Sequence, residues 1–346
     1  MAHNVYGIDF GTENIKIYDG TEMSIISEKE IIAIKDKDKI IGIGDKAYEM
    51  YEKTPDNIQA IFPIQYGVIA NLKCMQYLFE NFFKNITSKR SKIGRFCIAV
   101  PTDITEVEKK AFYDVVAKSE VRSREIKIVE KPIADAVALG FDMTSSRGNM
   151  IVNIGADTTE ISVISHGGIV ISRIIQIGGN KLNQILCDVV KRKYNILIGM
   201  KTAEKIKLEL ADAMYDEDAM TDDELDDSII YVYGRNVITG LPSERGVTSD
   251  NIYDATREFY NEIVDAIKDT LERTPPELTS DIKEVGLYLT GGSSLIKNLD
   301  KFVSKEVGVR VSTTTSPFES VIRGVSMIVS DPKYRNLMYE PTDSSF

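Results

Sequence analysis

The sequence has few of the residues that carry most acid–base and metal chemistry. Its two histidines, His3 and His166, lie beside no carboxylate or serine pattern, so histidine-based catalysis or metal binding is not indicated. Its three cysteines, Cys74, Cys97 and Cys187, are odd in number and lack the spacing of metal ligands. This pattern argues against a disulfide framework and predicts reduced, buried thiols in a cytoplasmic protein.

Long apolar runs and an excess of positive charge are also missing. Nowhere do about 18 apolar residues follow one another, which excludes a transmembrane helix, and Met1–Asp9 lacks the regions of a signal peptide. With 42 basic and 53 acidic residues the net charge is −11, which argues against binding to nucleic acid. A hydrophobic content of 43% in 346 residues predicts a globular protein of two domains or one divided unit.

A repeated pattern of strand, glycine turn and strand divides the chain into two halves of similar size. Apolar residues alternate on both sides of Gly11-Thr12 within Val5–Tyr18, and a second stretch of this kind spans Met150–Ile164. Further strand patterns follow at Ile25–Ile34 and Ile169–Ile177. The sequence therefore predicts an internal repeat of pattern rather than of identity.

Helical periodicity follows these strands in both halves, and the alternation of strands and helices predicts an α/β fold. The expected helices are Leu72–Phe83, Glu106–Ser119, Pro132–Leu139, Lys181–Tyr194, Thr202–Ala213, Asp254–Thr270 and Leu295–Val307. The acidic run Asp216–Asp227 indicates a solvated loop or, alternatively, a strip that binds a partner. The tail after Asp331 is expected to pack loosely and then fray.

Three turns that follow strands carry the main chemical signal, at residues 9–14, 153–159 and 289–294. Glycine lets backbone N–H groups approach an anion, and neighbouring hydroxyls add donors. A helix expected after Gly291-Gly292 would add partial positive charge at its N-terminus. The chain has neither a GxxxxGK[ST] nor a GxGxxG motif. One such turn is usually only a turn, but three of them, two in repeated hairpins, indicate a nucleotide held between two related domains.

The spacing of these turns resembles that of the superfamily of actins, heat-shock chaperones and sugar kinases. Within it, the chain is similar to the MreB family of bacterial actins, which determine cell shape, from about Val5 to Val329. The strings that carry this resemblance are Pro63–Ala70, Leu197–Gly199, Thr202–Lys207, Thr239–Pro242 and Thr270–Thr290.

The resemblance implies an actin-like two-domain ATPase fold, in which duplicated ribonuclease-H-like domains form four subdomains around a nucleotide cleft. Domain I would span residues 1–145, with a small subdomain at about 33–73 and a C-terminal segment at about 315–346 that returns to it. Domain II would span residues 146–314, with a small subdomain at about 182–245.

The resemblance also implies a site for ATP or ADP with Mg²⁺. Asp9 would lie near the metal, and Asn153 would hold it through water. The implied nucleotide-binding residues are Gly11, Thr12, Glu13 and Asn14 in the first phosphate turn, Gly155, Ala156, Asp157, Thr158 and Thr159 in the second, Gly179, then Glu204, Lys205 and Lys207 beside the ribose and adenine, and Gly291, Gly292, Ser293 and Ser294 over the adenosine. For Glu204 and Lys207, an ion pair on the helix surface is the alternative.

The expected catalytic residues, Glu130, Lys131 and Thr158, include a departure from the family. Where the family has Glu-Glu-Pro, this chain has Glu130-Lys131-Pro132. The second glutamate is the residue expected to orient the attacking water, and a charged lysine cannot accept a proton. Lys131 would instead bind the γ-phosphate or ADP and slow product release.

The second hairpin departs as well, because the family's Asp-Ile-Gly-Gly-Gly-Thr-Thr-Glu becomes residues 153–160 of this chain. Asn153 removes a carboxylate, and Asp157 places a negative charge beside a phosphate turn. We expect Lys131 and Asp157 to neutralise each other across the cleft; the alternative is that both point into solvent. These changes indicate nucleotide binding with very slow hydrolysis, although Thr158 leaves residual activity open.

Membrane contact is a separate question. The polar residues before Val5 leave no room for an amphipathic N-terminal helix. The loop Lys84–Arg95 holds five basic residues and two isoleucines, which favours contact with anionic lipid headgroups, and a solvated loop is the equal alternative.

The leading hypothesis is a nucleotide-binding protein that assembles with itself into double protofilaments at the inner face of the cell membrane. It would serve cell shape or motility together with other MreB isoforms. A fully competent MreB-type ATPase, in which a carboxylate such as Glu130 compensates for Lys131, is the second hypothesis. A sugar kinase is the third, but no motif for its substrate-binding aspartate stands out.

Overall fold

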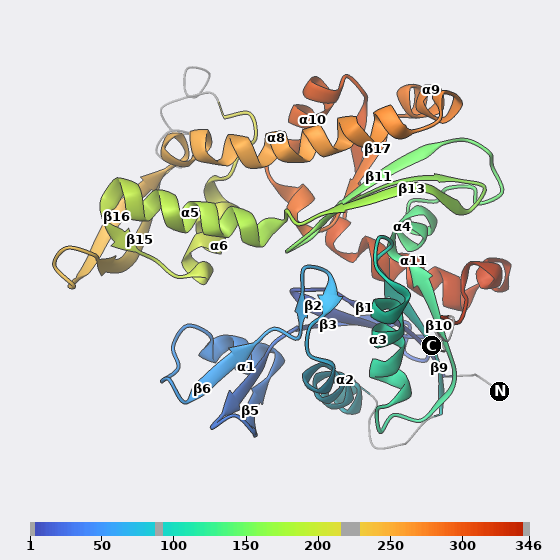
Figure 1. Ribbon diagram of the computed structural model, residues 1–346, viewed down its shortest axis with the longest axis horizontal. Helices are drawn as coiled ribbons and strands as arrows, with labels where there is room; N and C mark the ends of the chain where they lie inside the picture. The colour runs from blue at the N-terminus through green and yellow to red at the C-terminus, as the bar shows by residue number, and fades with distance from the viewer. Residues whose placement is uncertain (1–3, 87–92, 216–228, 342–346) are drawn as a thin grey trace. The chain divides into compact units, whose positions relative to one another are not determined.

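The computed structural model describes residues 4–86, 93–215 and 229–341 (Figure 1). Half of the predicted basic loop, residues 87–92, and the whole acidic run Asp216–Asp227 lie outside these residues. Within the described ranges, no helix combines the length and apolar character needed to cross a membrane.

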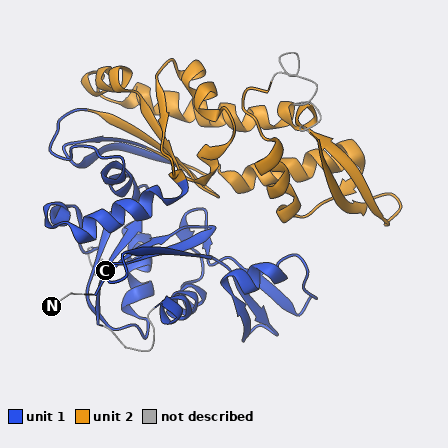
Figure 2. Cartoon of the chain, turned by 180° about the vertical axis from the view of Figure 1, so that it is seen from behind, with its two compact units in different colours: residues 1–147, 162–174, 318–346 blue, residues 148–161, 175–317 orange. Residues whose placement is uncertain are grey.

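The chain divides into two units (Figure 2). Unit 1 comprises residues 1–147, 162–174 and 318–346, and unit 2 comprises residues 148–161 and 175–317. The chain crosses between the units several times, so that neither unit is one continuous stretch of sequence.

A five-stranded sheet forms the centre of unit 1, in the order β10-β9-β1-β2-β3. Its strands are β1 (Val5–Phe10), β2 (Asn14–Asp19), β3 (Ser24–Lys29), β9 (Gly94–Val100) and β10 (Ser123–Glu130). β1 pairs antiparallel with β2 and parallel with β9, and β9 pairs parallel with β10. Because β1, β9 and β10 are parallel, the residues that follow them emerge at one edge of the sheet.

Helices cover both faces of this sheet. On one face, Tyr6, Ile8 and Phe10 of β1 pack with side chains of α2 (Leu72–Ile86) and α3 (Glu106–Ala117) in one buried cluster. On the other face lie α4 (Lys131–Ala138) and α11 (Ser320–Ser330). Gly7 makes that packing possible, since a Cβ there would lie 2.7 Å from Val325 of α11. The edge where β1 ends is thus held from both sides.

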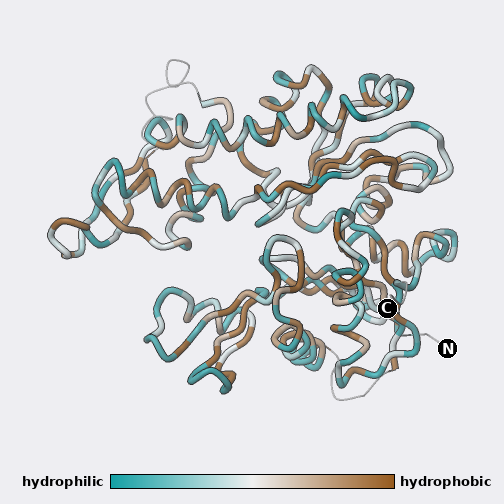
Figure 3. Tube along the Cα trace, in the orientation of Figure 1, coloured by the Kyte–Doolittle hydropathy of each residue, from teal (hydrophilic) through white to brown (hydrophobic). Residues whose placement is uncertain are grey.

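A second five-stranded sheet repeats the first one strand for strand, in the order β13-β12-β11-β17-β18. Its strands are β11 (Asn149–Ile154), β12 (Thr159–Ser165), β13 (Gly168–Ile175), β17 (Leu287–Thr290) and β18 (Val311–Thr313). β11 pairs parallel with β17, and β17 with β18, as β1 does with β9 and β9 with β10. The predicted internal repeat is confirmed, and the strands of both sheets are among the most hydrophobic segments of the chain (Figure 3).

Smaller sheets are inserted after the first three strands of each repeat. Unit 1 has a sheet in the order β5-β4-β6 with helix α1 (Gly44–Met50), and unit 2 has one in the order β14-β15-β16. The inserted strands are β4 (Ile32–Lys35), β5 (Lys39–Ile43), β6 (Ile58–Ile61), β7 (Ile64–Gln65), β8 (Val68–Ile69), β14 (Ile196–Leu197), β15 (Ile229–Asn236) and β16 (Pro242–Thr248). Among its described residues, unit 2 has the helices α5 (Gly179–Tyr194), α6 (Met200–Leu210), α8 (Ser249–Arg273), α9 (Pro276–Val285) and α10 (Leu299–Val307).

The predicted helices are present, with two corrections to the predicted elements near them. The helix expected at Leu295–Val307 begins only at Leu299, because Gly292–Leu295 forms a single 3₁₀ turn. The strand expected at Ile25–Ile34 breaks after Lys29, where the buried carboxylate of Glu30 accepts a hydrogen bond of 3.0 Å from the backbone N–H of Ile64.

The tail after Asp331 does not pack loosely as expected. Pro332–Leu337 forms a 3₁₀ helix, and Tyr339 then exchanges two backbone hydrogen bonds with Ile128 of β10, of 2.8 and 3.0 Å. Strand pairing, which the proline-containing sequence does not reveal, therefore fixes the tail as far as Tyr339. Of the predicted buried thiols, Cys74 and Cys97 are buried and Cys187 is partly buried.

Candidate functional site

The predicted site residues divide between the two units. Asp9, Gly11–Asn14, Glu130 and Lys131 belong to unit 1, and the remaining ones belong to unit 2.

In unit 1, the carboxylate of Asp9 lies at the end of β1 between two ammonium groups. The antiparallel register places Lys16 of β2 opposite Asp9, with Nζ 3.3 Å from Oδ2. Lys131, the first residue of α4, places its Nζ 3.1 Å from Oδ1. Burial opposes ionisation of Asp9, but the charges of Lys131 and Lys16 outweigh it and hold the pKa of the carboxyl below its usual value.

Lys131 is fixed by two acceptors of β1. Besides its ion pair with Asp9, Nζ donates a hydrogen bond of 3.3 Å to the carbonyl oxygen of Phe10. A cation in the first turn of a helix is disfavoured by the helix dipole, so the pairing with Asp9 offsets that cost. The side chain is 17% exposed, and the alternative that it points into solvent is therefore wrong. Its pairing with Asp157, a residue of the other unit, stays a prediction.

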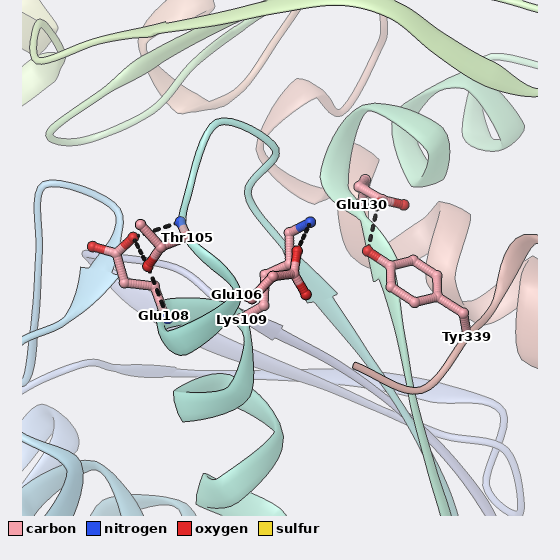
Figure 4. Close-up of polar contacts among 6 residues, drawn as sticks. All are labelled: Thr105, Glu106, Glu108, Lys109, Glu130 and Tyr339. Atoms are coloured by element: carbon pink, nitrogen blue, oxygen red, sulfur yellow. Dashed lines mark hydrogen bonds and ion pairs between the residues drawn. The ribbon is translucent and has the colours of Figure 1, made fainter. Parts of the chain in front are cut away.

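Glu130, which precedes Lys131, is bound by the C-terminal segment. The phenol of Tyr339 donates a short hydrogen bond to Oε1 of Glu130 (Figure 4). Burial and the neighbouring carboxylate raise the pKa of Tyr339, so the phenol remains a donor. One of the two oxygens of Glu130 is thus already occupied within unit 1.

The first glycine turn closes tightly after β1. The N–H of Gly11 donates to the carbonyl oxygen of Asn14 over 3.1 Å, and a Cβ at Gly11 would lie only 2.8 Å from that oxygen. Glu13 is held by an ion pair of 2.5 Å with Lys29 of β3. Thr12 therefore lies at the tip of a turn whose two ends are fixed.

In unit 2, the corresponding turn has the same closure and adjoins a helix N-terminus. The N–H of Gly155 donates to the carbonyl oxygen of Thr158 over 2.8 Å. The first N–H groups of α5, those of Gly179 and Asn180, donate to the carbonyl oxygens of Gly155 and Ala156, over 3.0 and 2.7 Å. Because a trans peptide directs its C=O and N–H oppositely, the N–H groups of Ala156 and Asp157 point away from the helix.

Asp157 itself faces the start of α5. Its Oδ1 accepts a hydrogen bond of 2.8 Å from the side-chain amide of Asn180, the second residue of that helix. The N-terminus of a helix favours a negative charge, so this placement stabilises the carboxylate. The charge that the sequence placed beside the turn is thus compensated locally.

A third glycine turn, at Gly291–Ser294, and helix α6 contact the turn at Gly155 and the start of α5. Ser293 Oγ donates to the carbonyl oxygen of Gly155 over 2.9 Å, and Lys207 Nζ donates to that of Gly179 over 3.3 Å. A Cβ at Gly179 would lie 2.7 Å from Ser293 Oγ and 3.1 Å from Lys207 Nζ. Gly291 has a φ of +83°, and a Cβ there would strike the carbonyl oxygen of Ile154 at 2.3 Å. Glycine is therefore needed where these elements approach.

Three of the hydroxyls that the sequence predicted as ligand donors, those of Thr159, Ser293 and Ser294, donate instead to the main chain. Thr159 Oγ1 donates to the carbonyl oxygen of Ile177 over 2.7 Å, and Ser294 Oγ to that of Gly291 over 2.7 Å. A hydroxyl has only one proton to donate. These three residues therefore hold the turns in place.

The residues of α6 differ in position. Lys207 donates a hydrogen bond to the carbonyl oxygen of Gly179, the first residue of α5. Lys205 is 60% exposed and pairs weakly with Glu209, 3.9 Å away. Glu204 is partly buried on the same helix. Of the two lysines, Lys207 is therefore the one that contacts the start of α5.

The charges at Asp9 do not fit a divalent cation. In the part of the chain that the structure describes, no three His, Cys, Asp or Glu side chains gather as metal ligands. Asp9 is the acidic residue expected at the metal, and both of its oxygens face ammonium groups. Two positive charges already lie where a metal would bind, and they would repel it.

Comparison with known proteins identifies the relatives of this chain. The family model described as MreB/Mbl protein matches residues 3–336. The chain belongs to the MreB/Mbl family. The cell shape-determining protein Mbl of Bacillus subtilis is 35% identical over 332 residues, which cover 94% of this chain and 95% of that protein.

Solved structures agree with this family assignment. MreB5 of Spiroplasma citri, solved bound to AMPPNP and bound to ADP, is 29% identical, with a TM-score of 0.88 over 97% of this chain and 98% of that one. The MamK double helical filament is 16% identical, with a TM-score of 0.77 over 95% and 99%. The fold of this MreB/Mbl chain is the predicted actin-like α/β fold.

Sequence reasoning missed three residues at Asp9 and Glu130. They are Lys16, Phe318 and Tyr339. Lys16 had a signal, because a hairpin closed at Gly11 pairs Asp9 with Lys16. Phe318 lies more than 300 residues from Lys16 and Tyr339 more than 200 from Glu130, and no local pattern relates them to the site.

Proposed function

We propose that this chain is a nucleotide-binding cytoskeletal protein that polymerises into actin-like filaments for cell shape or motility and hydrolyses ATP very slowly. Membership of the MreB/Mbl family supports the cytoskeletal part. The nucleotides bound in the structures of S. citri MreB5 support the ligand. The observation that supports slow hydrolysis is the ion pair between Lys131 and Asp9.

The proposed nucleotide site keeps the residues that the resemblance implies, in the four-subdomain division of the family. Phosphates would bind the turns at Gly11–Asn14 and Gly155–Thr159, whose N–H groups and neighbouring helix N-terminus favour an anion. Gly179, Glu204 and Lys207 would adjoin the ribose and adenine, with Lys205 at the exposed margin. Gly291–Ser294 would cover the adenosine.

Slow hydrolysis follows from the donors and acceptors at this site. Lys131 Nζ carries only protons to donate, so it cannot orient an attacking water through an acceptor or take its proton. Glu130 has one oxygen bound by Tyr339. Thr158, whose carbonyl oxygen closes the second turn, is the remaining proposed catalytic residue.

Assembly would follow the head-to-tail contact of actin-like protomers. Such a contact joins different surfaces, does not close, and therefore generates filaments. We propose double protofilaments that contain this chain, other MreB isoforms or both, and that lie at the inner face of the cell membrane.

Sedimentation and electron microscopy of the purified chain with AMPPNP test this function. Filaments in the pellet would support it. A strictly monomeric chain at high concentration, with nucleotide bound, would contradict the cytoskeletal function, and rapid phosphate release would contradict slow hydrolysis.

A further inference from the structure

The charge balance around Asp9 is uneven. One carboxylate, 5% exposed, faces two ammonium groups: that of Lys16, 8% exposed, and that of Lys131, 17% exposed. Within the described residues of unit 1, neither lysine has a second carboxylate at ion-pair distance. This nearly buried cluster therefore carries one positive charge in excess.

Both lysines are held in place rather than free to leave. Lys16 Nζ lies 4.1 Å from the centroid of the Phe318 ring, a cation–π contact, while its other side faces Asp9. Lys131 Nζ has Asp9 and the carbonyl oxygen of Phe10 as partners, and an ammonium group has three protons. One proton of Lys131 thus remains for an acceptor beside the first glycine turn.

A buried excess charge is costly unless a partner of opposite sign neutralises it. The repeat shows that unit 2 lacks a carboxylate at the position that corresponds to Asp9. Asp9 lies two residues before Gly11, and its counterpart two residues before Gly155 is the neutral Asn153. At this position, unit 1 holds a carboxylate that is already paired with ammonium groups and unit 2 holds none, which suits a free polyphosphate better than its metal complex.

We propose that the ammonium group of Lys131 replaces the divalent cation at Asp9, so that this chain binds nucleoside di- and triphosphates without a metal. This inference rests on the proposed nucleotide site. Lys131 and Lys16 present two ammonium groups against the one carboxylate of Asp9, and the remaining positive charge would pair with the phosphates. Asp9 then positions Lys131 instead of ligating a metal.

Binding of ADP and AMPPNP to the full chain, measured by isothermal titration calorimetry in excess EDTA and in saturating MgCl₂, tests the proposal. The two dissociation constants should agree within about threefold for the unmodified chain. In Lys131→Gln, affinity in EDTA should fall at least about tenfold below affinity in MgCl₂, because a cation is then required again.

The chain offers a matched control in Lys109. Its side chain is 16% exposed and pairs with Glu106 over 3.0 Å within unit 1 (Figure 4). Lys109→Gln should keep the metal independence of the unmodified chain. Circular dichroism and thermal melting of both variants verify that they are folded. If Lys131→Gln does not fold, the dissociation constants of the unmodified chain in EDTA and in MgCl₂ still test the proposal.

The outcomes separate this proposal from the one on which it rests. Binding of the unmodified chain only in MgCl₂ would overturn the replacement by Lys131 and leave the nucleotide site standing. No binding under either condition would overturn the nucleotide site itself. Equal affinities that persist in Lys131→Gln would show that Lys131 does not replace the metal.

Discussion

Tyr339 donates a hydrogen bond to Glu130, the residue that precedes Lys131 in the chain. The same tyrosine is joined to Ile128 by two backbone hydrogen bonds. The C-terminal segment therefore binds the end of β10, where Glu130 is the last residue of the strand and Lys131 begins α4. Its removal would act on Glu130 directly and on Lys131 through the start of α4.

Tyr339→Phe isolates the role of that hydrogen bond. Loss of a hydrogen bond to a carboxylate should lower the free energy of unfolding by about 1–3 kcal/mol, measured by urea denaturation. Phosphate release should not change, because Lys131 still lacks an acceptor. A clear rise in phosphate release would instead favour the competent ATPase in which Glu130 replaces the family glutamate.

Lys131→Glu should raise turnover modestly. It restores an acceptor for the attacking water, a contribution worth roughly 10²–10⁴-fold where geometry is right. The new carboxylate would also lie beside Asp9, which disfavours its charged form. Phosphate release at saturating magnesium-ATP, with nucleotide affinity measured in parallel, provides the comparison.

The triple variant Lys131→Glu, Asp157→Gly, Asn153→Asp should hydrolyse ATP much faster than Lys131→Glu. It restores all three positions at which the chain departs from the family pattern, including the carboxylate of the second hairpin. If the unmodified chain already hydrolyses ATP as fast as this variant, the three departures do not slow hydrolysis.

Asp9→Asn should destabilise unit 1 in a pH-dependent way. It leaves the ammonium groups of Lys16 and Lys131 without their carboxylate, at a cost of about 3–5 kcal/mol near neutral pH. Since the pKa of Asp9 is lowered by folding, its contribution is present above the usual pKa of an aspartate and is lost as pH falls through the folded value.

Urea denaturation of Asp9→Asn and the unmodified chain between neutral and acidic pH measures this effect. The difference between their stabilities should shrink below the ordinary aspartate pKa. Glu120→Gln, which breaks the exposed pair with Lys84, serves as the control and should cost less than about 1 kcal/mol. A difference that stays constant with pH would contradict the charge balance described at Asp9.

Adjacent glycines at the start of α5 should respond differently to alanine. A Cβ at Gly179 meets side-chain atoms, Ser293 Oγ and Lys207 Nζ, which can give way more readily than the main chain although both are hydrogen-bonded. Gly179→Ala should therefore weaken nucleotide binding about tenfold, as expected for about 1.4 kcal/mol, with little loss of stability. A Cβ at Gly178 meets the carbonyl oxygen of Ala156 at 2.5 Å, so Gly178→Ala should cost about 1–3 kcal/mol of stability.

Gly168→Ala controls for substitution of a glycine, because the nearest atom to its Cβ would be 3.8 Å away. It should leave nucleotide affinity unchanged. Thermal melting and calorimetric titration of the three variants check the pattern, and an unchanged affinity in Gly179→Ala would argue against a nucleotide beside this helix.

The sequence was sufficient to predict the fold where a signal was local and periodic. The two hairpins are examples, because Gly11 and Gly155 each close a turn between alternating strands. The sequence indicated that Lys131 departs from the family pattern, but it did not indicate Asp9 as its partner. A family pattern shows that a residue has changed, whereas its contact with Asp9 depends on where α4 begins relative to β1.

Long-range pairing limited the rest of the prediction. Tyr339 binds a strand more than 200 residues earlier, and Glu30 interrupts a strand pattern because its carboxylate accepts from Ile64. Neither partner is visible in a local window. The hydroxyls of Thr159 and Ser294 were expected to face a ligand, but they donate hydrogen bonds to main-chain carbonyl oxygens instead.

The backbone pairing of Tyr339 with Ile128 has a consequence for solubility. β10 is the outermost strand of its sheet, and an uncovered outer strand is a template on which strands of other molecules can add. By occupying the main-chain groups of Ile128, Tyr339 leaves fewer unpaired groups on this outer strand. The C-terminal segment thereby removes part of the template that a strand of another molecule would need.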